Sequence, residues 1–228
     1  PLFNFIYSYT VISITNGVVG YQDGPIATAQ WEEISGLCVD TSRNIYTSAY
    51  AKPVVRKISS DLLTASTLAG DRTVGDINGQ GTNAKLGSAD NISVDNNGTI
   101  YYADQNNDKI KKIDKNGNVT TFITNAFTNY CVTAEVAPSG NVYLLGSDIT
   151  TPSIAKYNAA GVLQWKISSH GVGYGTIDGD SSIVKFNTFS FGNVSIDETE
   201  ANLYFSTYSN ASGTPSQIRK LNLSTLTT

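Results

Sequence analysis

The sequence predicts an all-β protein, a β-propeller of four-stranded antiparallel blades, and three observations support this fold class. Short apolar strands alternate with polar turns along the 228 residues, and no segment shows the apolar spacing of a long helix. A four-strand unit recurs about four times, at intervals of about 40–60 residues. A similar turn, beginning with Asp or Asn and then Gly, precedes three of the units. Such units are typical of propeller blades, whose apolar faces are covered by neighbouring blades.

The unit begins with a short apolar strand, a polar turn and a second strand that carries a tyrosine. Its four copies are GLCVDTSRNIYTSAY (36–50), NISVDNNGTIYYADQ (91–105), AEVAPSGNVYLLGS (134–147) and NVSIDETEANLYFSTY (193–208). The tyrosine has the same place in each copy, which predicts four equivalent second strands. These tyrosines are Tyr46, Tyr101, Tyr143 and Tyr204.

A third strand follows in every copy and places basic residues between apolar ones, as a half-buried strand does. These strands are expected at 54–58, 110–113, 154–157 and 218–221. A fourth, outer strand is expected at 63–70, 117–124 and 161–168, and a similar strand at 9–17 precedes the first unit. The repeats then extend over about 18–70, 71–124, 125–168 and 169–228, with 1–17 as an outer blade strand.

The repeated turn connects the outer strand of one blade to the inner strand of the next. It reads DGPIATAQW (23–31), NGQGTNAKL (78–86) and DGDSSIVKF (178–186), and the third copy lacks its Asp-Gly pair. Gly provides backbone freedom, and the Asp or Asn before it can bond to nearby amides. We expect the bulky residue at the end of each turn to fill the seam between adjacent blades. These residues are Trp31, Leu86 and Phe186.

On these residues the chain resembles the NHL-repeat family in its bacterial form. The second copy matches most fully, with Asn78-Gly79, Val94-Asp95 and IKKI at 110–113, whereas the third has Val136-Ala137 where Val-Asp is expected. The resemblance covers about residues 9–228 and implies a β-propeller, usually six-bladed in this family. About four repeats are visible, so either further blades lie outside this sequence or the N-terminal strand closes a four-bladed ring.

Charge, hydropathy and cysteine content argue against several classes of protein. A net charge of −4 and a pI near 4.9 argue against a nucleic-acid partner, because phosphate binders carry a basic face. No apolar run approaches the roughly 18 residues of a spanning helix, so no membrane insertion is expected. Cys38 and Cys131 are too few for a disulfide scaffold, and a whole blade separates them, so we expect no bond.

No catalytic or metal-binding motif is recognisable. The resembled family includes a lyase branch with a His-ligated metal, but His170 is the single histidine and cannot build that site. Asp76-Ile-Asn78 and Asp178-Gly-Asp180 space oxygen ligands as calcium loops do, yet the distal Glu of such loops is absent, which favours plain turns. We therefore expect no metal, no cofactor and no enzymatic activity.

The remaining candidate is one rim of the propeller, where the turn before the first strand meets the turn between the second and third. Aromatic and amide side chains in these turns suit a protein or glycan partner. The prediction is a non-catalytic binding or scaffolding module, secreted or on a bacterial cell surface. Its expected contact residues are Tyr21, Tyr50, Gln105, Asn106, Asn107, Asp148, Tyr174 and Tyr208.

Two alternatives stay open. An exposed strand edge is a site for pairing, so the terminal strands (about 3–15 and 217–226) could pair with each other, or with a neighbouring subunit to build a fibre or polymer. The second alternative is a hydrolase or lyase with its site on the propeller rim or in the channel. A convergent cluster of ionisable groups with perturbed pKa values, or a metal, in the central channel would indicate it, whereas we expect a polar, mostly uncharged lining.

Overall fold

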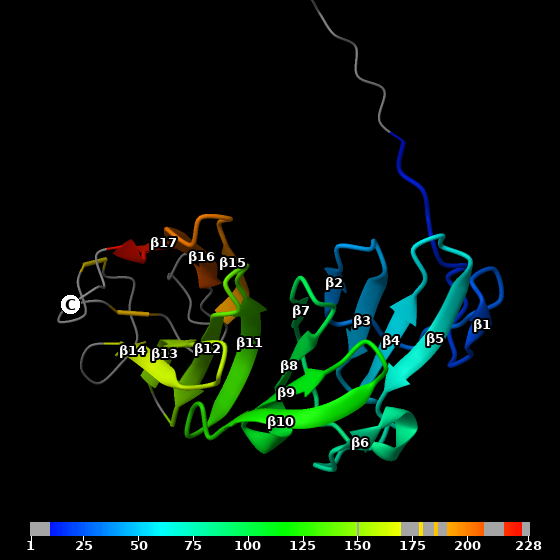
Figure 1. Cartoon of the computed structure of the whole chain (residues 1–228), viewed down its shortest axis with the longest axis horizontal. Helices are drawn as coiled ribbons and strands as arrows, with labels where there is room; N and C mark the ends of the chain where they lie inside the picture. Colours follow the sequence, from blue (N-terminus) through cyan, green and yellow to red (C-terminus); the bar gives the residue numbers. More distant parts are fainter. Residues whose placement is uncertain are drawn as a thin grey trace, which may run out of the picture.

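The computed structural model describes residues 10–149, 151–169, 178–179, 185–186, 191–207 and 217–224. Its strands form four antiparallel sheets arranged as propeller blades, each with its first strand facing the centre (Figure 1). The prediction of an all-β propeller is confirmed. Apart from Ser224, helix in the described ranges is confined to the short 3-10 turns η1 (Gly81–Asn83) and η2 (Gln105–Asn107).

Blades 1 and 2 each run from an inner strand to a short fifth strand on the outer edge. Blade 1 contains β2 (Leu37–Val39), β3 (Ile45–Ala49), β4 (Val54–Ile58), β5 (Thr64–Ala69) and β1 (Gly24–Pro25). Blade 2 contains β7 (Ile92–Val94), β8 (Ile100–Asp104), β9 (Lys109–Ile113), β10 (Asn118–Thr124) and β6 (Gly79–Gln80). The fifth strand in both blades is the Gly of the repeated turn and the residue after it.

Blades 3 and 4 have no such fifth strand within the described residues. Blade 3 contains β11 (Tyr130–Val136), β12 (Val142–Asp148), β13 (Thr151–Tyr157) and β14 (Leu163–Ser168). Blade 4 contains β15 (Phe191–Ile196), β16 (Asn202–Thr207) and β17 (Gln217–Asn222). The predicted outer strands at 63–70, 117–124 and 161–168 correspond to β5, β10 and β14.

The second and third strands of every blade pair in the same register. A tyrosine faces a lysine in each: Tyr46–Lys57, Tyr101–Lys112, Tyr143–Lys156 and Tyr204–Lys220. The lysine Nζ lies between 5.0 and 5.9 Å from the centroid of its tyrosine ring, which is a cation–π distance. The four tyrosines are therefore equivalent, as predicted, and each pair stabilises its blade across the strands.

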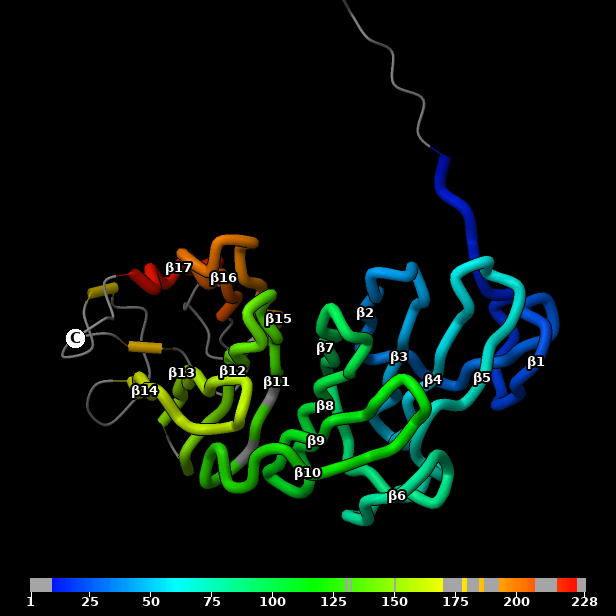
Figure 2. The backbone as a smooth tube through the Cα atoms, viewed as in Figure 1, coloured from blue at the N-terminus to red at the C-terminus, as the bar shows by residue number. Residues whose placement is uncertain are grey.

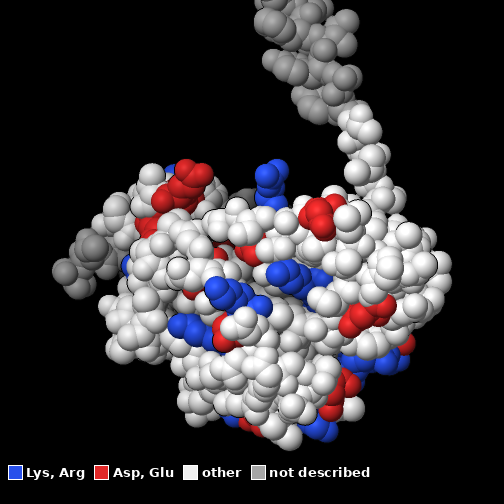
Figure 3. All heavy atoms as spheres, turned by 45° about the vertical axis from the view of Figure 1, so that its right-hand side comes forward, with Lys and Arg blue, Asp and Glu red and all other residues white. Residues whose placement is uncertain are grey.

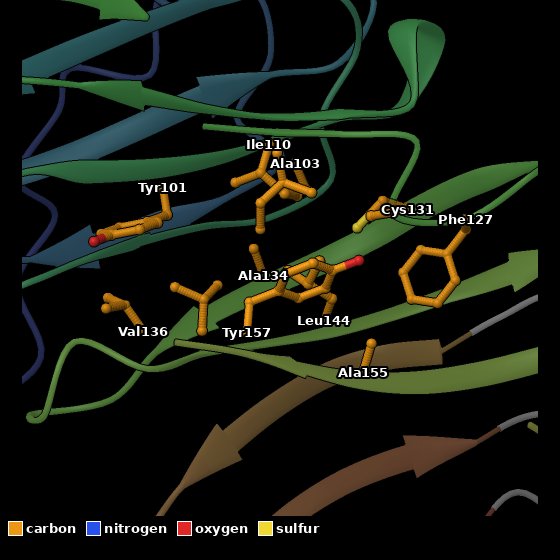
Figure 4. Close-up of a cluster of buried hydrophobic side chains, with 13 residues drawn as sticks. Tyr101, Ala103, Ile110, Phe127, Cys131, Ala134, Val136, Leu144, Ala155 and Tyr157 are labelled. Carbon is orange, nitrogen blue, oxygen red and sulfur yellow. The ribbon is translucent and has the colours of Figure 1, made fainter. Parts of the chain in front are cut away.

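Apolar seams between adjacent blades form the core. In the seam between blades 2 and 3, Tyr101 and Ile110 lie against Ala134 and Val136 (Figure 4). Leu86 is fully buried in the seam between blades 1 and 2. Phe186 is likewise buried between blades 3 and 4, so both residues fill seams as predicted. Trp31 instead remains half-buried and lies over the guanidinium of Arg56, whose Cζ is 4.2 Å from a ring centroid.

The repeated turn also wraps around a buried cation on the third strand. In blade 1, Arg56 donates to Asp23 Oδ1 at 2.7 Å and to the carbonyl oxygens of Gln22 and Gln30. In the other two blades with the turn, Lys111 pairs with Asp76 at 2.5 Å and Arg219 pairs with Asp178 at 2.6 Å. A buried charge needs such partners, because losing its hydration is costly.

Blade 3 lacks both the buried cation and the Asp-Gly turn. At the cation's place its third strand has Ala155, which is fully buried, and no Asp-Gly turn precedes the blade. The turn thus occurs where the third strand carries a buried cation. The paired carboxylate is the first residue of the turn in blades 1 and 4, whereas in blade 2 it is Asp76, two residues before the turn. This pairing also explains the calcium-like spacing in blade 2, because the oxygens of Asp76 and Asn78 accept hydrogen bonds from Lys111.

The prediction of an outer strand at 9–17 is wrong for residues 10–17, which form no strand. The outer edge of β5 is occupied by Gly24–Pro25, and Val11 and Ile12 are exposed. At the other end β17 pairs with β16, and in the described part of the chain no strand joins the two ends. Cys38 and Cys131 are free thiols, as predicted.

The blades follow one another along an arc (Figure 2). Adjacent inner strands are in contact: β2 with β7, β7 with β11, and β11 with β15. Blade 1 and blade 4 lie at opposite ends of the arc, with β5 on one side and β17 on the other (Figures 1 and 2). No helix in the described ranges is long and apolar enough to cross a membrane.

Candidate functional site

The inner strands of all four blades border one central cavity of about 500 Å³. Each blade contributes the residues of its first strand or those just before it, so the radial arrangement of the repeats creates the cavity. Its lining is largely polar. The polar side chains are Ser35, Asp90, Asn91, Ser93, Glu135 and Asn193.

Two acidic side chains line this channel, and Glu135 is the more buried of them. It lies on β11 between Ala134 and Val136, which pack into the seam with blade 2, so strand alternation directs Glu135 to the opposite face. The side chain is half-buried, and this burial raises the pKa of its carboxyl to about 7 from an ordinary 4.5. Among the described residues, no hydrogen bond or ion pair reaches the carboxyl, so nothing offsets the burial.

Side-chain hydrogen bonds connect the walls of the channel. Asn91 Nδ2, just before β7, donates to Asn193 Oδ1 on β15 at 3.1 Å. Ser93 Oγ accepts from the backbone N–H of Val136 at 3.1 Å, which ties blade 2 to blade 3. These bonds fix neutral amide and hydroxyl groups around the cavity that contains Glu135.

Cys38 also lines the channel, but its thiol is not a nucleophile at neutral pH. Burial, with smaller effects from the Glu135 and Asp40 carboxylates, raises its pKa to about 12. A thiol that stays protonated reacts slowly, because the thiolate is the reactive form. Asp90 is exposed, where it accepts a hydrogen bond from Gln105 Nε2 at 2.7 Å. Glu135 is therefore the channel residue best suited to proton transfer near neutral pH.

The described residues contain no cluster of three or more His, Cys, Asp or Glu side chains that could hold a metal ion.

Three of the predicted rim residues, Gln105, Asn106 and Asn107, form the turn η2 and brace the loop before β7. Asn106 Oδ1 accepts from the backbone N–H of Ser88, and Asn107 Nδ2 donates to the Gly75 carbonyl oxygen at 2.8 Å. The two kinds of turn thus meet at one rim in blade 2. Their side chains, however, bond within the protein.

The other predicted rim residues are dispersed. Tyr21 lies against Arg72, whose Cζ is 4.2 Å from the ring centroid, Tyr50 is exposed, and Asp148 pairs with Lys166 at 2.5 Å. None of the described rim residues lines the channel cavity. Tyr174 and Tyr208, like His170, lie outside the described residues.

The sequence contains a signal for Glu135, although the predicted contact residues all lay in the rim turns. At its place in the inner strand the other copies have Cys38, Ser93 and Ser195. Only the third copy puts an acid in the middle of an apolar inner strand. A carboxyl in such a place must be partnered or change its pKa, which is typical of functional sites.

Comparison with known proteins shows the fold. No family model matches the chain, and no curated protein matches it. Among solved structures, it is similar to a gluconolactonase from Xanthomonas campestris, with a TM-score of 0.58 and 11% identity over 92% of this chain and 60% of that one. It is also similar to a luciferin-regenerating enzyme, with a TM-score of 0.54 and 13% identity over 82% of this chain and 60% of that one. The chain thus spans about 60% of the length of each.

These observations correct the prediction of a non-catalytic binding or scaffolding module. Both similar structures are enzymes by name, although identities of 11% and 13% establish only the shared propeller fold. The lining is mostly uncharged, as expected, but it includes Glu135 with a pKa raised to about 7. A single carboxyl is not the convergent cluster that was expected to distinguish an enzyme, yet together with the two enzymes named above it favours the alternative of a hydrolase or lyase.

Proposed function

We propose that the protein is a hydrolase whose active site is the central channel, with Glu135 as general base. The observation that carries the proposal is a half-buried carboxyl with a pKa of about 7, next to a cavity of about 500 Å³. A general base works best when its pKa lies near the operating pH. A cavity of this volume suits a small molecule.

The channel residues suggest the following chemistry for an ester or lactone. The Glu135 carboxylate takes a proton from a water molecule while the water oxygen attacks the carbonyl carbon. The C–O bond to the leaving alkoxide then breaks, and the proton returns from Glu135 to that alkoxide, giving a carboxylic acid and an alcohol. The amide N–H groups of Asn91 and Asn193 are neutral donors for the carbonyl oxygen, on which negative charge develops.

The lining favours a neutral, hydroxylated substrate. No Lys or Arg is among the described residues that line the cavity, so an anionic substrate would find no counter-charge there. Asparagine and serine side chains can instead hydrogen-bond to hydroxyl groups. Together with the likeness to a gluconolactonase, this lining makes the lactones of sugar acids the first substrate class to test.

The test is hydrolysis of a panel of neutral sugar lactones and small esters by the wild type and by Glu135→Gln. The substitution keeps the side chain's size but removes the base, and we expect a loss of about 10²–10⁴-fold in kcat/KM. Glu198→Gln is the matched control, because Glu198 is exposed in the turn between β15 and β16. Equal turnover by the wild type and Glu135→Gln, or no turnover of any substrate, would contradict the proposal.

We propose further that the four units are NHL repeats. The recurring inner strand, Tyr-bearing second strand and basic third strand support this assignment. Secretion or display on a bacterial surface stays a prediction from composition. Charged side chains of both signs are scattered over an otherwise uncharged face, which agrees with the low charge content of the chain (Figure 3).

A further inference from the structure

Asp90, the second acidic side chain of the channel, belongs to a segment that hydrogen bonds hold from two sides. The segment comprises residues 87–90, just before the inner strand β7. On one side lie β8 and η2 of the same blade. Tyr102 Oη donates to the carbonyl oxygen of Gly87, and Asp104 Oδ2 accepts from the backbone N–H of Gly87 at 3.1 Å. The first residue of the segment is therefore fixed at both its backbone groups.

The next two residues of the segment are fixed in the same way. The Ser88 carbonyl oxygen accepts from the backbone N–H of Gln105 at 2.9 Å, and the Ser88 N–H donates to Asn106 Oδ1. On the other side, Ser35 Oγ of blade 1 donates to the carbonyl oxygen of Ala89 at 2.7 Å. The segment is thus held by its own blade and by the neighbouring blade before any ligand binds, which lowers the entropy cost of binding.

Gln105 also fixes the side chain of Asp90. Its Nε2 donates to Asp90 Oδ2 at 2.7 Å. Among the described residues, no group bonds to the other carboxylate oxygen, Oδ1. Asp90 lines the same cavity as Glu135, so this second oxygen is an acceptor that a ligand in the cavity can use.

The chemistry of this acceptor determines which ligand groups it binds. A carboxylate accepts hydrogen bonds and donates none, so it binds hydroxyl groups and repels anions. No Lys or Arg is among the described residues that line the cavity, so no cation there neutralises Asp90. The next residue, Asn91, adds an amide that can donate to the same hydroxylated ligand.

We propose that Asp90 is a specificity-determining residue of the channel, which accepts hydrogen bonds from the hydroxyl groups of the substrate, with Gln105 as its positioning residue. For its substrate class, the neutral lactones of sugar acids, this inference rests on the proposed function. Hydrolysis converts such a lactone into an ionised acid. The Asp90 carboxylate binds the lactone through its hydroxyl groups but repels the charge of the acid, so it favours release of the product.

The test measures binding without turnover, by NMR titration in the Glu135→Gln background. This background leaves Asp90 as the acid among the described lining residues. The ligands are a hydroxylated sugar δ-lactam, the unsubstituted δ-lactam and the sugar acid. Lactams replace lactones because an amide bond resists hydrolysis. Asp90→Asn is the informative substitution, since its amide oxygen can still accept from Gln105 while the second oxygen is replaced by a donor.

With Asp90 present, the hydroxylated lactam should bind more tightly than the unsubstituted one. Asp90→Asn should weaken binding of the hydroxylated lactam by about 10–100-fold, the range of a hydrogen bond to a charged group. It should leave the unsubstituted lactam unchanged and tighten binding of the acid by about 1.5–5-fold, because exposed charges interact weakly. Gln105→Ala should weaken the hydroxylated lactam by about 2–10-fold, since the acceptor is kept but no longer fixed.

Asp61→Asn is the matched control, because Asp61 is exposed in the turn between β4 and β5 and does not line the cavity. It should bind all three ligands as the Glu135→Gln parent does. Equal binding of the two lactams by the parent would overturn the proposal. So would an Asp90→Asn variant that changes nothing, or one that weakens all three ligands alike, which is the result of a purely structural role.

The outcome is separable from that of the proposed function. If the ligand preferences appear but the wild type hydrolyses no lactone, Asp90 binds hydroxyl groups and the hydrolase proposal fails. If the wild type hydrolyses sugar lactones but Asp90→Asn changes no ligand's affinity, the hydrolase proposal stands and the role of Asp90 is wrong.

Discussion

At the scale of single residues, the ionisation of Glu135 has opposite effects on the stability of the fold and on the proposed activity. Its pKa in the folded chain, about 7, lies above the ordinary 4.5, so folding favours the protonated form. The stability that this preference provides is fully present below the unfolded pKa and is lost as the pH rises through about 7. The base, however, acts in its ionised form. The carboxyl therefore becomes active over the same pH range in which it destabilises the fold.

The first prediction concerns stability against pH. Between about pH 5 and about pH 8, the free energy of unfolding of the wild type should fall more than that of Glu135→Gln, by on the order of 1–2 kcal/mol once solvent screening is allowed for. Urea unfolding at both pH values measures the difference. Glu198→Gln should follow the wild type, and the same pH dependence in all three proteins would contradict the assigned burial of Glu135.

The second prediction concerns activity against pH. If Glu135 is the base, kcat/KM of the wild type on a hydrolysed lactone should rise with pH and level off above an apparent pKa of about 7. Residual turnover by Glu135→Gln, corrected for spontaneous hydrolysis, should lack that rise. A wild-type profile that is flat through neutral pH would assign the proton transfer to another group.

At the scale of elements, the repeated turn and the third strand depend on each other. Asp76 lies 35 residues from Lys111 in the chain, yet its carboxylate accepts from the Lys111 ammonium, which is almost fully buried. We predict that Asp76→Ala costs about 3–5 kcal/mol in the free energy of unfolding, because it leaves a buried charge without its carboxylate.

The double variant Asp76→Ala with Lys111→Met should recover much of that loss, because an apolar side chain in place of a buried ion pair is often neutral. Blade 3 supports this expectation, since Ala155 occupies the same place without any carboxylate. Denaturant unfolding of the wild type, both single variants and the double variant gives the coupling free energy. Additive losses would mean that the turn and the strand are independent.

The sequence predicted most of these elements because turn residues and alternation are local signals. It did not predict the pairing of Asp76 with Lys111, because that requires knowing which side of the third strand the preceding turn crosses. The sequence also predicted a strand at 9–17. Polar and apolar side chains alternate there as in a strand, but Gly24–Pro25 already occupies the edge of β5. The acid of Glu135 in an apolar inner strand is visible in the sequence, but the size of its pKa shift depends on burial between blades, which no local pattern gives.

At the scale of the whole molecule, stability is expected to be a sum over blades and the seams between them, as in other repeat proteins. The end blades then differ from the inner ones although their sequences are alike. In blade 4, Leu203 and Phe205 are buried on the face of the sheet that packs on blade 3, whereas Tyr204 and Ile218 on the opposite face are exposed. The contribution of a residue to the free energy of unfolding should therefore depend more on the position of its blade in the arc than on which amino acid it is.

Ile154 and Ile218 test this dependence on position, because they occupy the same place in the third strands of blades 3 and 4 and are 0% and 85% exposed. In dilute, monomeric protein, Ile154→Ala should cost about 2–5 kcal/mol through the cavity it leaves in the seam. Ile218→Ala should change the free energy of unfolding by less than about 0.5 kcal/mol. Urea unfolding of the wild type and both variants measures the two losses. A large loss from Ile218→Ala would mean that this side chain is covered in the folded protein, and position in the arc would then not explain the difference between the two blades.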